Sequence, residues 1–180
     1  MIIPNEHGMI AGGQISSMVT RRDKVNYYLD IAEAVSQNST CLCFNWGAVI
    51  VSDDEVISTG YMGAPRGRQS CMDVGCCYKD IANMTGECKQ GVCRSVHAEA
   101  NAIISASRRM MKGSSLYLVG VDKCNKGYIE NPHVCSSCRM FIINAGIRDV
   151  YIRIDKDHYI RETVMSWVEN DDSLTDKASY

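Results

Sequence analysis

The sequence predicts a single α/β domain in which helices cover a mixed β-sheet. The chain has 180 residues, which is enough for one domain with a proper core. Its hydrophobic content of 46% and charged content of 22% are ordinary for a globular protein. Its apolar patterns follow the order helix, β-hairpin, helix, strand, helix, strand, and this order favours a sheet with helices packed against it.

The N-terminal part of the chain supplies one helix and one hairpin. Residues 1–20 are expected to form an irregular N-terminal arm. Residues 21–37 place their apolar side chains at helical spacing. The segments 46–51 (WGAVIV) and 56–61 (VISTGY) predict two strands, and the polar residues 52–55 between them predict a hairpin turn.

Helices and strands alternate in the C-terminal part. Residues 97–107 (HAEANAIISAS) and 135–145 (CSSCRMFIINA) predict helices, and Gly146 ends the second one. The apolar segments 116–121 and 149–154 predict two strands, one after each of these helices.

We expect the folded domain to cover residues 21–169, with two polar insertions inside it and a tail after it. A Cys-rich and Gly-rich insertion covers residues 62–95, and a smaller polar insertion covers 122–131. A last helix is predicted over 160–168, and residues 170–180 are expected to form an acidic C-terminal tail.

Charge and composition exclude several classes of function. The formal net charge of −2 shows no basic footprint, which argues against a nucleic-acid partner. No segment approaches the roughly 18 apolar residues of a membrane span, and the first residues (MIIPNEHGMIAGGQ) lack the pattern of a signal peptide. We therefore expect a cytoplasmic protein whose ten cysteines are reduced thiols and metal ligands.

Two short motifs, His97-Ala98-Glu99 and Cys135-Ser136-Ser137-Cys138, contain one imidazole, two thiols and one carboxylate. One His and two Cys give a four-coordinate zinc ion one open position, which water can fill. Zinc lowers the pKa of such a water to roughly 7, and a carboxylate that is not a ligand can carry the proton. Hydrolytic zinc deaminases use this set, and in them water replaces an amino group of a nucleobase. We predict His97, Cys135 and Cys138 as zinc ligands and Glu99 as the catalytic base and acid.

Each motif alone permits a simpler interpretation. A Cys-x-x-Cys pair is also compatible with a redox pair or with two buried thiols, and His-Ala-Glu alone is uninformative. Both motifs begin predicted helices, with the strand over 116–121 between them, and this shared context favours the zinc site. His97 and Glu99 are only two positions apart, so they converge only if His97 lies at the very start of its helix.

At these residues the sequence resembles the cytidine and deoxycytidylate deaminase family, in its deoxycytidylate branch, over about residues 21–154. The chain looks most like the late-competence-type members, which have a similar Cys-rich insertion. The matching motifs are residues 39–41, 47–51, 57–61, 63–67, 97–103 and 142–147. The resemblance implies a cytidine-deaminase-like α/β/α sandwich with a five-stranded mixed sheet, a homo-oligomer, and a free pyrimidine nucleotide as substrate. The simplest reaction of this kind converts dCMP to dUMP and ammonia.

The resemblance also suggests substrate contacts. By position, Gly47 and Ala48 lie under the pyrimidine. Arg66 and Arg108 rank first as phosphate contacts, because they belong to the glycine-containing loop and the ligand helix. The other candidates are Arg68, Arg94 and Arg139.

Two departures from the family pattern concern the substrate. Met62 stands where the family loop usually has an Asn that contacts the sugar or phosphate, and a thioether cannot replace an amide. Val134, where the family usually has Pro, precedes Cys135. Asn45 is a candidate to replace the lost hydrogen bonds. Two alternatives therefore stay open: deamination of another aminated nucleobase or nucleoside, and a competence-related nucleic-acid-binding protein with the same fold.

A second cysteine cluster lies in the insertion, where Cys71, Cys76, Cys77, Cys88 and Cys93 fall close together. A structural zinc ion would explain how a polar segment with little core holds a shape. Cys71 and Cys93 are the first candidate ligands, followed by Cys41 and Cys76. Free thiols or a disulfide are the competing interpretations.

Overall fold

The computed structural model describes residues 21–77 and 93–170. The predicted N-terminal arm, residues 78–92 of the Cys-rich insertion with Cys88, and all but the first residue of the predicted tail lie outside the described residues. The elements in chain order are α1 (Lys24–Ser36), β1 (Phe44–Ser52), β2 (Glu55–Tyr61), α2 (Cys71–Val74), α4 (Ala98–Ile104), α5 (Arg108–Met111), β3 (Ser115–Asp122), β4 (Gly127–Tyr128), α6 (Ser136–Ala145), β5 (Asp149–Arg153), β6 (Tyr159–Thr163) and α7 (Val164–Glu169).

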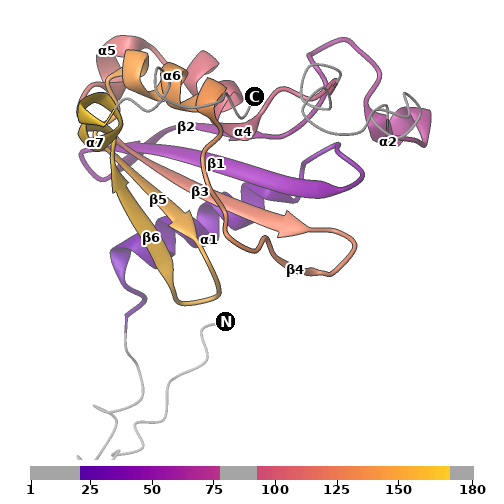
Figure 1. Cartoon of the computed structure of the whole chain (residues 1–180), viewed down its shortest axis with the longest axis horizontal. Helices are drawn as coiled ribbons and strands as arrows, with labels where there is room; N and C mark the ends of the chain where they lie inside the picture. The colour runs from indigo at the N-terminus through magenta and orange to yellow at the C-terminus, as the bar shows by residue number, and fades with distance from the viewer. Residues whose placement is uncertain (1–20, 78–92, 171–180) are drawn as a thin grey trace, which may run out of the picture.

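One mixed sheet forms the centre of the molecule (Figure 1). Its strand order is β2-β1-β3-β5-β6, and the short β4 pairs with β3. The β3–β5 pair is parallel, whereas the other pairs are antiparallel. The prediction of a mixed sheet is therefore confirmed.

Helices cover both faces of this sheet, as Figure 1 shows. Along β1, Ala48 and Ile50 point into the core beneath α4 and α6, while Val49 and Val51 point into the core beneath α1. Successive side chains of a strand point to opposite faces, so a strand buried on both faces is apolar throughout. This explains the unbroken run GAVIV and confirms the α/β/α sandwich.

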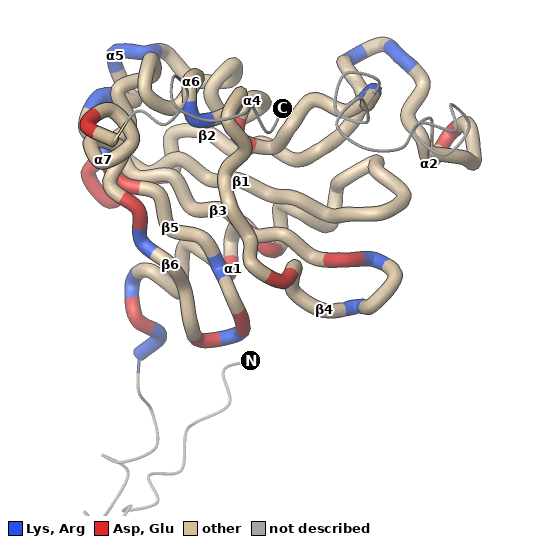
Figure 2. Tube along the Cα trace, viewed as in Figure 1, with Lys and Arg blue, Asp and Glu red and all other residues tan. Residues whose placement is uncertain are grey.

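A fully buried arginine attaches α1 to β5. The guanidinium of Arg153 donates hydrogen bonds to Glu33 Oε2 at 2.9 Å and lies 2.8 Å from Asp30 Oδ1. Its Nη2 also donates to the carbonyl oxygen of Asn26 at 3.1 Å. Most other charged residues lie at the ends of elements and in loops (Figure 2). The central strand β1 has no charged residue, and β3 has one, at its end.

The helix predicted over 160–168 is wrong in its first half. Tyr159–Thr163 forms β6, and only Val164–Glu169 is helical. Apolar residues at 160, 164 and 167 have helical spacing, but the free edge of β5 offers backbone partners that the spacing does not reveal. No helix in the described part of the chain combines the length and apolar character needed to cross a bilayer.

Candidate metal centre

The two predicted ligand helices begin in the same way. His97 is the N-cap residue of α4, with extended φ and ψ of −69° and 155°. Cys135 is the N-cap residue of α6, with φ and ψ of −67° and 157°. Because His97 precedes the first helical turn, its side chain and that of Glu99 can point toward the same site. This is the arrangement that their spacing of two residues required.

Close contacts with β2 fix the position of α4. Gly60 lies directly beneath this helix, because a Cβ atom there would lie 2.3 Å from the carbonyl oxygen of Ala98. Two hydrogen bonds hold the helix to the strand: Asn101 Nδ2 donates to the Tyr61 carbonyl at 2.8 Å, and Ser58 Oγ donates to the Ala102 carbonyl at 2.8 Å. The ligand helix is therefore held on the sheet by its backbone as well as by its apolar side chains.

A short β-bridge places the residue before His97. The amide of Val96 donates to the Gly63 carbonyl at 2.7 Å, and the Gly63 amide donates back to the Val96 carbonyl at 3.2 Å. The chain thus approaches His97 along the residues that continue from β2.

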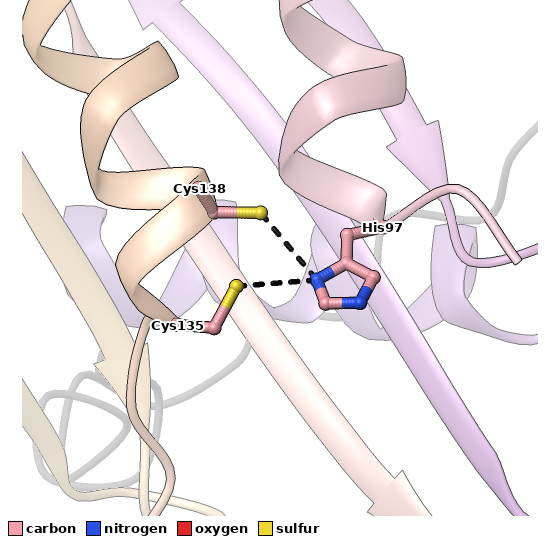
Figure 3. A group of neighbouring side chains, drawn as sticks. All are labelled: His97, Cys135 and Cys138. Carbon is pink, nitrogen blue, oxygen red and sulfur yellow. Dashed lines mark hydrogen bonds between the residues drawn. The ribbon is translucent and has the colours of Figure 1, made fainter. Parts of the chain in front are cut away.

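The imidazole of His97 faces both cysteines (Figure 3). Its Nδ1 lies 3.4 Å from Cys135 Sγ and 3.4 Å from Cys138 Sγ. In a tetrahedral site with Zn–N of about 2.0 Å and Zn–S of about 2.3 Å, nitrogen and sulfur ligands lie about 3.5 Å apart. These three ligand atoms lie within 4.8 Å of one another, so their spacing fits one zinc ion.

The charges of this cluster also suit a cation. The thiol of Cys138 donates a hydrogen bond to Cys135, and together with His97 it lowers the pKa of Cys135 to about 4 although burial opposes this. The same hydrogen bond and burial raise the pKa of Cys138. The two neighbouring thiols therefore lose a first proton more readily than a second, and a divalent cation between them would stabilise both thiolates.

Glu99 lies beside the three candidate ligands and is 5% exposed. Burial raises the pKa of its carboxyl above the ordinary value, while nearby His97 and a hydrogen bond from Cys138 oppose the rise. The raised pKa suits a group that must accept and release a proton near neutral pH. The site combines a cation-binding triad with a proton carrier.

A family model described as the cytidine and deoxycytidylate deaminase zinc-binding region matches residues 22–154. The chain belongs to this family. The matched range contains His97, Glu99, Cys135 and Cys138, and the family assignment places the chain among zinc-dependent deaminases. The domain limits of 21–169 remain a prediction.

Curated relatives agree with this assignment. The deoxycytidylate deaminase of Mycobacterium phage D29 is 33% identical over 134 residues, which cover 73% of this chain and 95% of the relative. The deoxycytidylate deaminase of Schizosaccharomyces pombe is 30% identical over 125 residues, which cover 69% of this chain but only 35% of that longer relative. ComE operon protein 2 of Bacillus subtilis is 30% identical over 158 residues, which cover 83% of this chain and 74% of the relative. The last relative confirms the predicted likeness to late-competence-type members.

A solved structure supports the fold class. The crystal structure of dCMP deaminase from the cyanophage S-TIM5 in apo form superposes with a TM-score of 0.51 at 26% identity, covering 74% of this chain and 85% of that chain. The predicted cytidine-deaminase-like fold is confirmed.

The two predicted base contacts, Gly47 and Ala48, face opposite sides of β1. A Cβ atom on Gly47 would lie 2.2 Å from the Ala32 carbonyl oxygen, so this glycine permits α1 to approach the sheet. Ala48 points to the opposite face, into the core that contains Ala98 and Cys138. Gly47 can therefore serve the site only through its backbone, and the contact of Gly47 and Ala48 with the base remains a prediction.

Asn45 lies on the face of β1 that α1 covers. It is two residues before Gly47 in a strand that pairs regularly with β3, and its partner Val121 packs in the core beneath α1. Its Oδ1 atom is buried and lacks a hydrogen-bond partner among the described residues. This placement, on the other side of the sheet from His97, does not favour the predicted contact between Asn45 and substrate.

The two predicted phosphate contacts lie in different places. Arg66 is exposed in the loop that follows the bridge between Gly63 and Val96, the residue before His97. Arg108 donates from Nε to the Asn144 carbonyl at 2.7 Å, at the C-terminal end of α6. With a rise of 1.5 Å per residue, that point lies about 13 Å along the helix from Cys135. The structure therefore keeps Arg66 as a candidate and places Arg108 away from the ligands.

The second cysteine cluster stays a prediction. Within 21–77 and 93–170, the only group of three or more potential ligands close enough for one metal ion is His97, Cys135 and Cys138. Cys41, Cys71, Cys76 and Cys93 have free thiols.

Sequence reasoning missed the residues that position α4, namely Gly60, Ser58 and Asn101. Gly60 and Ser58 belong to the segment VISTGY, which we interpreted as a strand and as part of a family motif, and Asn101 appeared only as part of another such motif. A glycine in a strand often marks a close backbone approach, and that signal was present.

Proposed function

We propose that the chain catalyses the hydrolytic deamination of dCMP to dUMP and ammonia, with a zinc ion held by His97, Cys135 and Cys138. The convergence of one imidazole nitrogen and two sulfurs beside the buried Glu99 is the observation on which this proposal rests. The names of the phage and yeast relatives support dCMP as the substrate.

The residues of the chain have separate tasks in this reaction. Zinc, when bound, acts as a Lewis acid that makes hydroxide available at neutral pH. Cys135 and Cys138 lie at the start of α6, where the helix dipole stabilises thiolates. The carboxyl group of Glu99 accepts one proton from the attacking water and passes it to the ring nitrogen; it then takes the remaining proton of the added hydroxyl group and gives it to the departing amine, which leaves as ammonia.

Zinc analysis and a substrate assay test the proposal together. The zinc-loaded full chain should release ammonia from dCMP with a matching change in absorbance. A Glu99→Gln variant should keep its zinc and lose kcat by roughly 100- to 10,000-fold, because proton transfer contributes about that much. Absence of ammonia release from every cytosine nucleotide, nucleoside and free base would refute the proposal, and so would full activity of the variant.

Met62 supports a second candidate, deamination of another aminated nucleobase or nucleoside. Its side chain is 8% exposed, and its backbone is held between Trp46 and Thr40 by hydrogen bonds of 3.0 and 3.1 Å. The residue just before the bridge to Val96 is therefore apolar and fixed. A panel of cytosine and adenine derivatives, with and without phosphate, separates the two candidates by their kcat/KM values.

We also propose a homo-oligomer. The helices that cover the ligand face of the sheet expose a set of large apolar side chains, which are Ile104, Met110, Met140, Phe141, Met165 and Val168. A second copy of the chain would remove this apolar area from water. Light scattering should give a mass above 20.0 kDa for the wild type and a smaller mass for a Met140→Ser, Phe141→Ser double variant. The exposed Val56→Ser change on β2 is the control, and a monomeric wild type would refute this proposal.

A further inference from the structure

The aromatic residue Trp46 lies on the face of the sheet that carries the metal ligands. Ala48 and Trp46 are two positions apart in β1, and both pack against the core that contains Ala98 and Cys138. Gly47 between them faces α1. Strand alternation therefore brings the indole to the side of the sheet where the reaction is proposed to take place.

The pairing of β1 with β2 places Trp46 beyond the N-terminal end of α4. Ala48 pairs with Gly60, which lies beneath Ala98 in the first turn of the helix. Trp46 is two residues, or about 7 Å, farther along β1. At this level the Met62 amide donates to the Trp46 carbonyl at 3.0 Å.

Gly63 connects Trp46 and Met62 to the proposed zinc ligand His97. Gly63 follows Met62 and bridges to Val96, the residue immediately before His97. Trp46 and Met62 thus lie beyond the N-terminus of α4, next to the residues that lead to His97.

A glycine on the neighbouring strand makes room for the indole. Trp46 pairs with Gly120 of β3, and a Cβ atom on Gly120 would lie 2.7 Å from both Cζ3 and Cη2 of the ring. The same Cβ atom would lie 2.8 Å from Ile129 Cδ1. The ring therefore lies against the surface of β3 with Ile129 beside it, and Trp46 as a whole residue is only partly buried.

We propose that Trp46 is a substrate-binding residue, whose ring packs against the nucleoside part of the nucleotide, and that Gly120 sets the position of the ring. This inference rests on the proposed deaminase function. A planar base or a sugar face gains affinity from contact with an aromatic ring, roughly 5- to 100-fold per contact. Because the indole of Trp46 carries no group that accepts or releases the transferred protons, its effect should fall on KM more than on kcat.

Fluorescence gives a direct measurement, because the chain has two tryptophans, Trp46 and Trp167. The second one belongs to α7, where its indole N–H donates to Glu162 at 2.8 Å. In the zinc-loaded chain, dUMP should change the emission of the Trp167→Phe variant, whose only tryptophan is Trp46. It should leave the emission of the Trp46→Phe variant almost unchanged. The reverse pattern would overturn the inference.

Kinetics provide the second measurement. Trp46→Leu should raise KM for dCMP at least fivefold and change kcat by less than threefold. Gly120→Ala gives the same test without removing the indole, since the atoms it meets are the ends of two side chains, which can move. Its matched control is Gly127→Ala in β4, where the nearest atom to a Cβ would be 3.9 Å away.

The two proposals fail in different ways. If the zinc-loaded wild type deaminates dCMP, and both Trp46→Leu and Gly120→Ala keep its KM, Trp46 is not a binding residue. If the wild type releases no ammonia from dCMP, the deaminase proposal fails. The dUMP titration of Trp167→Phe then still decides whether Trp46 contacts a nucleotide.

Discussion

Gly60 lies in contact with the first turn of α4, and a Cβ atom on it would be 2.3 Å from the carbonyl oxygen of Ala98. Ala98 stands between the proposed ligand His97 and the proposed proton carrier Glu99. The height of both functional side chains above the sheet therefore depends on the absence of a side chain at residue 60.

We expect Gly60→Ala to weaken both the fold and the metal site. The added methyl group meets backbone atoms, which cannot move aside, so α4 must shift. Overpacking of this kind costs about 1–3 kcal/mol of the free energy of unfolding. Urea denaturation should show that loss, and a zinc titration should show at least tenfold weaker binding. Gly127→Ala is the exposed control, and equal values for the two variants would contradict the role assigned to Gly60.

The sequence was sufficient for the parts of the site that depend on local chemistry. The ligand types at 97, 135 and 138 and the two helix starts are each encoded by a few neighbouring residues, and the structure brings the two groups together. The apolar run over 46–51 likewise predicted a strand, and the structure has β1 there.

The parts that depend on strand register could not be obtained in this way. Asn45 and Trp46 are neighbours in sequence, but they face opposite sides of the sheet, and nothing local to them says which side holds the ligands. Arg108 follows the ligand helix in sequence, yet it lies at the far end of that layer because α4 extends away from His97. The strand β6 owes its form to pairing with β5, which the spacing of Ile160 and Val164 does not reveal.

Removal of one ligand should separate the proposed catalytic zinc from any second ion. We expect Cys138→Ala to lose one zinc per chain and all measurable deamination, because two ligands bind zinc far more weakly than three. Cys124→Ala is the control, since this cysteine is an exposed free thiol. Elemental analysis counts the ions in each variant. An unchanged zinc content in Cys138→Ala would contradict the ligand assignment, and zinc that remains after Cys138 is replaced would point to the second cluster.

Arg153 should matter for stability and not for catalysis. Its guanidinium is fully buried and binds Asp30 and Glu33 of α1, on the face of the sheet away from the ligands. Arg153→Met leaves these carboxylates without their partner. Because they are about one-third exposed, we expect a loss of about 2–3 kcal/mol, below the full cost of breaking a buried pair.

Chemical denaturation measures the effect of Arg153→Met on the free energy of unfolding. The exposed Arg109→Met is the matched control and should change stability by less than about 0.5 kcal/mol. Under conditions where Arg153→Met stays folded, its kcat should equal that of the wild type. A selective loss of kcat would show that the ion pairs reach the site.

Asp149 should make stability depend on pH in the acidic range. Burial alone would raise the pKa of its carboxyl, but hydrogen bonds from Arg148 at 2.8 Å and Arg161 at 3.0 Å outweigh burial and lower that pKa. A carboxyl whose pKa is lower in the folded state stabilises the fold above its unfolded pKa of about 3.9. That contribution disappears as pH falls through the lower folded value.

We therefore expect Asp149→Asn to reduce the free energy of unfolding by about 1–2 kcal/mol at pH 7, a value that allows for the exposure of both arginines. The difference from the wild type should stay constant from pH 7 to pH 5 and shrink below about pH 4. Urea denaturation at each pH gives these values, with the exposed Glu55→Gln as the control. A difference that grows on acidification would mean that burial, and not the two arginines, governs the pKa of Asp149.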